Sequence, residues 1–137
     1  MNKQIERTLS IIKPDAVERN LESKIKEIFL KDNLNIIDSK KIKITKEEAE
    51  QFYKVHQSKP FYNDLCTYLS SGPIIVMILE GENVIIKNRE LMGATDPKKA
   101  SKGTIRDLYG ISIDKNSVHG SDSKENAKSE INFFFKS

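Results

Sequence analysis

Several residue types are scarce in this 137-residue chain, and each scarcity excludes a class of protein. Cys66 is the single cysteine, so an intramolecular disulfide is impossible and a cysteine-based zinc site is not expected. No apolar run approaches the length needed to cross a bilayer, and the first residues lack the hydrophobic region of a signal peptide. The sequence therefore predicts a reduced, soluble, cytoplasmic protein with no membrane partner.

A large excess of charge of one sign is absent as well. The net charge of +3, from 23 basic and 20 acidic residues, is too small to indicate binding to nucleic acid or to a membrane. The chain length suits one domain with a single core, and no linker, repeat or low-complexity segment divides it. We therefore expect a single domain over residues 1–137.

The hydrophobic pattern predicts alternating strands and helices. We expect strands at 8–12, 34–44, 73–79 and near Val118. Helices are expected from Leu21, from a capping box at Thr45, from Phe61, over 82–92 and at the end of the chain, with a long irregular segment at 93–115. This order indicates an α+β protein with a split βαβ pattern, in which helices pack on one face of an antiparallel sheet.

The most informative stretch is 116–123 (Asn-Ser-Val-His-Gly-Ser-Asp-Ser), which contains His119, one of only two histidines. Residues 122–125 (Asp-Ser-Lys-Glu) indicate a helix start with a capping box. A histidine just before a helix N-terminus faces backbone N–H groups suited to a phosphate, and imidazole is a nucleophile. Taken alone, however, such a run is more typical of an ordinary turn.

Three further segments change that interpretation: 6–16 (Glu-Arg-Thr-Leu-Ser-Ile-Ile-Lys-Pro-Asp-Ala), 93–97 (Gly-Ala-Thr-Asp-Pro) and 103–106 (Gly-Thr-Ile-Arg). Together with 116–123 they resemble the nucleoside diphosphate kinases, in the right order and over nearly the whole chain. The resemblance implies a ferredoxin-like fold, with a four-stranded antiparallel sheet and helices packed on it. It also implies transfer of the γ-phosphoryl group of a nucleoside triphosphate, typically ATP, to a nucleoside or deoxynucleoside diphosphate.

The resemblance further implies a ping-pong mechanism through a pros-phosphohistidine at His119. A covalent intermediate lets one pocket serve donor and acceptor in turn, although their polyphosphates repel each other. Glu130, with Ser121 as its partner, is expected to orient the imidazole, and Tyr53 is expected close to it. His56 lies on an apolar helix stripe and is expected to be a packed or half-exposed residue without a catalytic role.

Phosphoryl transfer also needs positioned cations. The resemblance implies that Lys13 contacts the ribose hydroxyls and the phosphates, and that Arg89 and Arg106 contact the β- and γ-phosphates. It places the Thr95 hydroxyl on the phosphates and Asn116 on the ribose hydroxyl.

A nucleobase needs an apolar slot. Periodicity alone would make Phe61 a core residue, whereas the resemblance implies that Phe61 stacks on the base, with Leu65 and Ile113 adding to the slot. Stacking without hydrogen bonds to the base edge would tolerate every base.

The sequence has no cluster of acidic residues or histidines with the spacing of a metal cage, and no Walker motif. We therefore expect Mg²⁺ to arrive with the nucleotide, held by its phosphates and through water to Asp122.

Partners and alternatives complete the expectations. The expected partners are nucleoside di- and triphosphates and further copies of the chain, with no nucleic acid required. A hexamer is favoured over a tetramer, because the loop containing Pro97 commonly lies in the subunit contacts of the family.

The main alternative is a non-catalytic nucleotide- or nucleic-acid-binding module on a ferredoxin-like scaffold. RNA-binding versions of that scaffold display aromatic residues on their strands, and 8–12 and 73–79 contain none. A third possibility is transfer of the histidine phosphate to a histidine of another protein.

Overall fold

A computed structural model describes residues 5–113 and 115–135. In chain order, its elements are β1 (Ile5–Ile12), α1 (Pro14–Glu18), α2 (Glu22–Lys31), β2 (Asn35–Ile42), α3 (Lys46–Phe52), η1 (Lys54–His56), α4 (Tyr62–Leu69), β3 (Ile74–Glu82), α5 (Val84–Met92), η2 (Pro97–Lys99), α6 (Ile105–Tyr109), β4 (Val118–Gly120) and α7 (Lys124–Phe134). Within the described residues, none of these helices is long and apolar enough to cross a bilayer.

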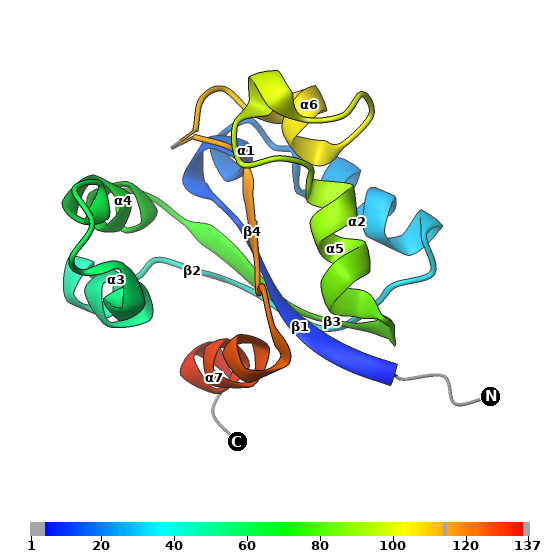
Figure 1. The fold of residues 1–137 in the computed structure, drawn as a ribbon, viewed down its shortest axis with the longest axis horizontal. Helices are drawn as coiled ribbons and strands as arrows, with labels where there is room; N and C mark the ends of the chain where they lie inside the picture. Colours follow the sequence, from blue (N-terminus) through cyan, green and yellow to red (C-terminus); the bar gives the residue numbers. More distant parts are fainter. Residues whose placement is uncertain (1–4, 114, 136–137) are drawn as a thin grey trace.

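The four strands form one antiparallel sheet in the order β2-β3-β1-β4 (Figure 1). The central strands β1 and β3 are the most apolar, as expected for strands with a neighbour on each side. In the register of the sheet, Ile11 of β1 lies between Val76 of β3 and His119 of β4. This topology confirms the predicted ferredoxin-like α+β fold and places the histidine on a short edge strand.

Helices cover both faces of the sheet, so the expectation of helices on one face is wrong. On one face, Ile75, Met77 and Leu79 of β3 pack in a core with α2 and α5. On the other face, Ile74 and Val76 pack with residues of α3, α4 and α7, and Figure 1 shows α2 and α5 on the opposite side of the sheet from α3 and α4. Consecutive apolar residues along β3 leave neither face of the strand polar, so helices must pack on both faces of the sheet to exclude solvent.

Several element boundaries also differ from those expected. The helix expected over 82–92 begins at Val84, because β3 continues to Glu82 and Asn83 turns the chain in the left-handed conformation, with a φ of 53°. The short helix α1 was not expected, and the segment 93–115 contains η2 and α6. Short helices of this kind present too few residues for a periodic pattern to indicate them.

One of the two expected capping boxes is present. At α3, Thr45 accepts from the backbone N–H of Glu48, whose side chain accepts from the backbone N–H of Thr45. At α7, the Ser123 hydroxyl accepts from the backbone N–H of Asn126, and an asparagine stands where the reciprocal glutamate would be needed. The start of α7 was therefore predicted correctly, whereas the prediction of a capping box there was wrong.

The turn that enters the 93–97 segment depends on glycine. Gly93 has a φ of 86°, and a Cβ atom there would lie 2.4 Å from the Thr104 hydroxyl oxygen. We expect Gly93→Ala to lower the free energy of unfolding by about 2–4 kcal/mol, because the strained backbone and the collision add. Gly103 is a matched control: its φ is 91°, and an added Cβ would meet nothing within 4 Å. Gly103→Ala should therefore lower the free energy of unfolding by only about 1 kcal/mol. If urea denaturation gave the same loss for both variants, the expected collision between an alanine at position 93 and Thr104 would be contradicted.

Candidate functional site

A cleft of about 430 Å³ opens between the end of β1, β4, α4, α5 and α6. The predicted site residues from widely separated parts of the chain line this cleft, with the exception of Ser121 and Glu130, which lie behind His119. His56, Met92 and Gly120 line it as well. The fold thus gathers most of the residues singled out by the sequence around one cavity.

His119 is held by its neighbours at one ring nitrogen. Its Nε2 lies 2.9 Å from Oε1 of Glu130 on α7, and its ring makes edge-to-face contacts with Phe52 and Tyr53, at centroid distances of 5.3 and 6.2 Å. A carboxylate beside Nε2 favours the tautomer in which Nε2 carries the proton and donates it in a hydrogen bond. The Nδ1 lone pair is then left for chemistry.

Glu130 is itself held in place. The hydroxyl of Ser121 donates to the same Oε1 atom at 2.9 Å. Ser121 is fully buried, and it exchanges hydrogen bonds with Leu9 of β1: its hydroxyl accepts from the Leu9 N–H at 3.3 Å, and its own N–H donates to the Leu9 carbonyl at 3.2 Å. The chain of contacts from β1 to Ser121, Glu130 and His119 therefore fixes the imidazole to the central sheet.

Tyr53 caps the C-terminus of α3 and is almost fully buried beside the imidazole. Burial, followed by the nearby negative charge of Glu130, raises the pKa of its phenol. The tyrosine therefore stays protonated at neutral pH.

Lys13 lies at the end of β1, where Pro14 begins α1. Its side chain is only 5% exposed, and its Nζ donates to Oδ1 of Asn116 at 2.9 Å. The Asn116 amide in turn donates to the carbonyl of Thr95 at 3.0 Å. Three predicted nucleotide-binding residues are thus joined in one hydrogen-bonded row.

The two arginines differ in their surroundings. Arg106 of α6 is buried, and its terminal nitrogens donate to the carbonyls of Gly93 (3.0 Å) and Val118 (2.9 Å). Burial, followed by repulsion from Arg89, lowers the pKa of Arg106 to about 10. Arg89 of α5 is exposed at the surface of the cleft. Two adjacent cations, one desolvated, make this end of the cleft attractive to an anion.

Other residues that line the cleft are apolar. Phe61, just before α4, is 45% exposed, Leu65 lies one helical turn further on, and Ile113 is 56% exposed. Phe61 is therefore not the core residue that periodicity alone favoured. An exposed ring on the wall of a cleft is available for stacking on a planar ligand.

His56 was assigned no role from its sequence pattern, and the structure places it in the cleft. Its ring centroid lies 6.2 Å from that of Phe61. Burial, followed by the positive charge of Lys59 and the neighbouring His119, lowers its pKa, so the imidazole is neutral at pH 7. The apolar pattern did not indicate that His56 lies in the cleft, because η1 turns this residue out of the helical register of α3.

Asp122 lines the cleft near the cationic end and is exposed to solvent. The Asn126 amide donates to its carboxylate at 2.5 Å, and this bond is the main cause that lowers the pKa of Asp122. In the described part of the chain, no group of three or more His, Cys, Asp or Glu side chains has the arrangement of a metal site. An ionised carboxylate beside an anion-binding region suits a cation that is shared with a ligand.

Comparison with known proteins agrees with this geometry. The family model of nucleoside diphosphate kinase matches residues 6–137. The chain is 60% identical to the nucleoside diphosphate kinase of Campylobacter hominis over 131 residues, which is 96% of each chain, and 59% identical to that of Nitratiruptor sp. over the same share. Among solved structures, the nucleoside diphosphate kinase of Aquifex aeolicus superimposes with a TM-score of 0.95 and 40% identity, covering 97% of this chain and 96% of that one. The enzyme from Encephalitozoon cuniculi gives a TM-score of 0.94 and 39% identity, covering 96% of this chain and 90% of that one.

Proposed function

Because this chain belongs to the nucleoside diphosphate kinase family and is a phosphotransferase of that kind, we propose that it works through a covalent phosphate on Nδ1 of His119. The observation that carries this proposal is the 2.9 Å contact between Nε2 and Glu130. It engages Nε2 in a hydrogen bond, favours the tautomer in which Nε2 carries the proton, and leaves the Nδ1 lone pair to accept the phosphoryl group. The Glu130 carboxylate also stabilises the positive charge that develops on the ring when Nδ1 is phosphorylated.

Each half-reaction exchanges one bond for another of similar kind. In the first, the Nδ1 lone pair forms a bond to the γ-phosphorus, the bond from this phosphorus to the bridging oxygen breaks, and the diphosphate leaves. In the second, a terminal oxygen of the acceptor diphosphate bonds to the same phosphorus, and the bond to Nδ1 breaks. Arg89 and Arg106 stabilise the charge on the moving phosphoryl group in both directions.

The remaining lining residues orient the nucleotide along the cleft. The base stacks on Phe61, between Leu65 and Ile113. Lys13 and Asn116 bind the ribose hydroxyls, and Lys13 together with the Thr95 hydroxyl extends the contacts to the phosphates. His56 contributes a neutral imidazole beside the base slot, and Tyr53 keeps the His119 ring in its plane. This order is supported by the row of hydrogen bonds from Lys13 to Thr95 and by the presence of both apolar and cationic side chains in the lining of the cleft.

Magnesium is the expected metal, and the site suits it. When bound with the nucleotide, Mg²⁺ would supply charge neutralisation of the phosphates, with the Asp122 carboxylate as a ligand through water. Removing divalent cations with EDTA should therefore abolish transfer and leave the fold unchanged.

Transfer assays with several acceptors test the function. The protein, labelled with γ-phosphate from ATP and Mg²⁺, should form an acid-labile phosphoenzyme and pass the label to purine, pyrimidine and deoxyribose diphosphates alike. The alternative, a binding module, would need an exposed aromatic platform on the sheet. In this chain β1 and β3 contain no aromatic residue, and helices cover both faces of the sheet, which argues against that alternative. A protein that binds nucleotide but never becomes phosphorylated would restore that alternative.

The role of Glu130 can be measured separately. We expect Glu130→Gln to slow phosphoenzyme formation by about 10- to 100-fold, because the amide keeps the shape but loses the charge that stabilises the phosphorylated ring. Rapid-quench measurement of a single turnover with ATP gives this rate directly. Glu125→Gln is the matched control, since Glu125 lies exposed in the first turn of the same helix. A Glu130→Gln rate equal to that of the control would contradict the proposed orientation.

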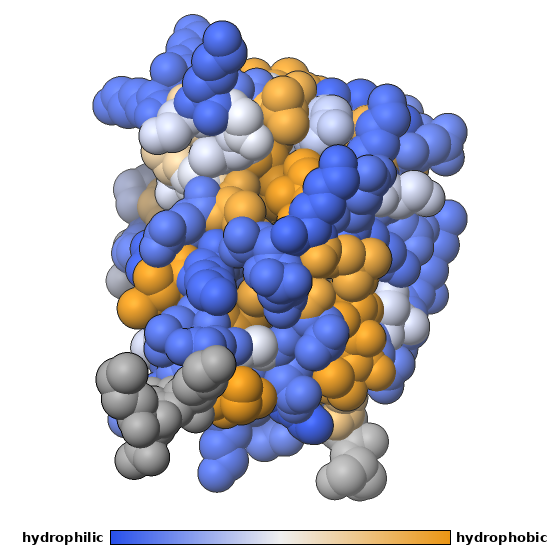
Figure 2. All heavy atoms as spheres, turned by 90° about the vertical axis from the view of Figure 1, so that its right-hand side faces the viewer, coloured by the Kyte–Doolittle hydropathy of each residue, from blue (hydrophilic) through white to orange (hydrophobic). Residues whose placement is uncertain are grey.

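We also infer that the chain acts as a single domain over residues 1–137, in the cytoplasm, as a homo-oligomer. Exposed apolar side chains support self-association: Leu30, Ile86 and Leu108 lie on α2, α5 and α6. These helices are on the side of the molecule seen in Figure 2, where apolar patches interrupt the charged surface. Ile37 is 44% exposed on β2, which is an edge strand of the sheet formed by the described residues. A hexamer is favoured over a tetramer, and light scattering after gel filtration distinguishes the two masses.

A further inference from the structure

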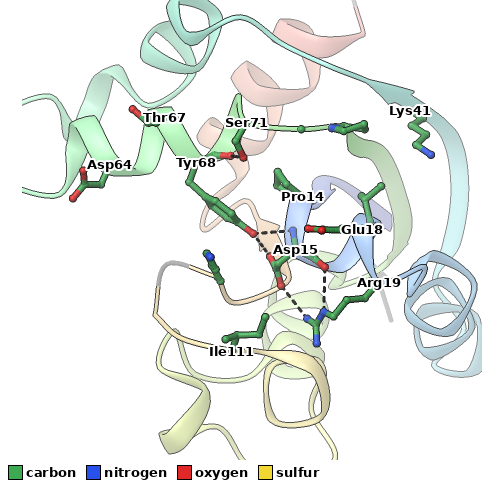
Figure 3. Close-up of a pocket in the computed structure, with 14 residues that line it drawn as sticks. Pro14, Asp15, Glu18, Arg19, Lys41, Asp64, Thr67, Tyr68, Ser71 and Ile111 are labelled. Atoms are coloured by element: carbon green, nitrogen blue, oxygen red, sulfur yellow. Dashed lines mark hydrogen bonds and ion pairs between the residues drawn. The ribbon is translucent and has the colours of Figure 1, made fainter.

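A second groove of about 1140 Å³ shares no lining residue with the cleft. Asp15 lies at its floor, with a side chain that is only 4% exposed. In Figure 3, Asp15 lies between Tyr68 on one side and Arg19 on the other. A carboxylate that is nearly buried needs several hydrogen-bond donors, and the identity of these donors is informative.

Three side chains donate to the Asp15 carboxylate. The Tyr68 hydroxyl donates to Oδ1, and the Ser117 hydroxyl and an Arg19 terminal nitrogen each donate to Oδ2 at 3.1 Å. The backbone N–H of Asp15 donates back to the Tyr68 hydroxyl at 2.8 Å. Burial, followed by the bond to Asp15, raises the pKa of Tyr68, so its phenol remains a donor.

Each donor belongs to a segment that carries a wall of the cleft or is hydrogen-bonded to one. Tyr68 lies on α4, with Leu65, and Ser117 directly follows Asn116. The same terminal nitrogen of Arg19 also donates to the carbonyl of Tyr109, the last residue of α6, at 2.5 Å. The α6 helix carries Arg106.

Asp15 itself lies two residues after Lys13, so the carboxylate joins four segments from behind: the β1–α1 turn, α4, α6 and the approach to β4. These segments are far apart in the sequence, and the contacts above connect them on this side of the cleft.

Ser117 shows why this connection matters for the nucleotide. Its φ of 75° is in the left-handed region, which is unfavourable for a residue other than glycine. Three bonds hold it there: its carbonyl accepts from the Lys13 N–H at 2.8 Å, its hydroxyl donates to Asp15, and the same hydroxyl accepts from an Arg19 terminal nitrogen at 3.4 Å. This conformation directs Asn116 toward Lys13 and Thr95 and lets Val118 enter β4.

We propose that Asp15 is a positioning residue for nucleotide binding, which holds the Lys13, Asn116, Arg106 and α4 walls of the cleft at a fixed separation. The inference rests on the proposed function of the cleft. Asp15 touches no part of the cleft and acts through Ser117, Arg19 and Tyr68. Its substitution should therefore weaken nucleotide binding more than it slows phosphoryl transfer, because the contact between His119 and Glu130 lies outside this network.

The test compares Asp15→Asn with the wild type. The asparagine has nearly the same volume, but its amide nitrogen cannot accept from a donor. Calorimetry should show the Kd for ADP raised by about tenfold, and steady-state assays should show a similar rise in KM. The kcat at saturating nucleotide should change by less than about threefold.

Two further variants and one control keep the test decisive if Asp15→Asn fails to fold. Tyr68→Phe and Ser117→Ala each remove one donor and should raise the Kd by about threefold. Tyr62→Phe is the matched control: its hydroxyl, also on α4, donates to the Glu50 carbonyl at 2.8 Å and has no contact with Asp15. It should lower the melting temperature as much as Tyr68→Phe does, with the Kd unchanged.

The proposal is overturned if the Kd of Tyr68→Phe and Ser117→Ala stays at the wild-type value, or if Tyr62→Phe raises it equally. A fall in kcat without a change in KM or Kd would overturn it too. Because the Kd needs no chemistry, this outcome is independent of the phosphohistidine: a wild type that binds ADP but forms no phosphoenzyme defeats the covalent mechanism and leaves the comparison of the Kd values intact.

Discussion

The His119→Ala variant should bind nucleotides and transfer no phosphate. Without the imidazole, no group in the cleft takes the place of Nδ1, and direct transfer would require two polyphosphates to occupy the same cationic end. We expect kcat to fall by at least about 10⁴-fold, as for the loss of other covalent nucleophiles. The phosphoenzyme formed with ATP and Mg²⁺ should disappear completely, as measured by intact mass at neutral pH.

The second histidine provides the control for this experiment. His56 lines the same cleft but has no carboxylate partner among its described contacts, whereas His119 has Glu130. His56→Gln should therefore still become phosphorylated, with an altered nucleotide affinity. Phosphate retained by His119→Ala and lost by His56→Gln would exchange the roles of the two residues.

The Arg106→Ala variant should show the next largest effect. Arg106 is buried, donates to the carbonyls of Gly93 and Val118, and carries one of the two charges at the cationic end of the cleft. We expect kcat/KM to fall by about 10²- to 10³-fold, because both the transition-state charge and the position of β4 depend on it. Its removal should also lower the free energy of unfolding by about 1–3 kcal/mol, because one buried and one partly buried carbonyl lose their donors.

Two variants separate these contributions. Arg106→Lys keeps the charge but cannot donate to both carbonyls, so it should retain part of the activity. Arg7→Ala removes the same charge from an exposed pair with Glu80 on the neighbouring strand and should leave kcat/KM unchanged. If Arg106→Ala kept kcat/KM within about threefold of the wild type per folded molecule, the cationic end would not be the phosphate site.

The residues that meet in the cleft could be singled out because they lie in short runs with unusual order. The stretch 116–123 and the Gly93 and Gly103 segments combine glycine, hydroxyl and basic residues in a spacing that few other folds require. The resemblance that these runs carry is confirmed by the family match over residues 6–137. The antiparallel sheet was predictable for a different reason, since the order of strands and helices matches the split βαβ pattern of the ferredoxin-like fold that the resemblance implies.

Other features could not be read from the sequence. The two-sided cover of the sheet depends on which helix returns to which face, and periodicity says nothing about that choice. His56 shared an apolar pattern with α3, and only the turn of η1 brings it to the cleft. The network around Asp15 joins residues up to 102 positions apart, so no local pattern indicated it.

The half-exposed ring of Phe61 has a consequence for the composition of the nucleotide pool. A base that stacks on an open wall would keep its hydrogen-bonding edge in water, so we expect adenine, guanine, cytosine, uracil and thymine all to be accepted. Since the exchanged bonds are alike, the catalysed equilibrium constant is close to one for each pair. In a cell that regenerates ATP, every other nucleotide, including the precursors of DNA, would then be drawn toward the same ratio of triphosphate to diphosphate as adenosine.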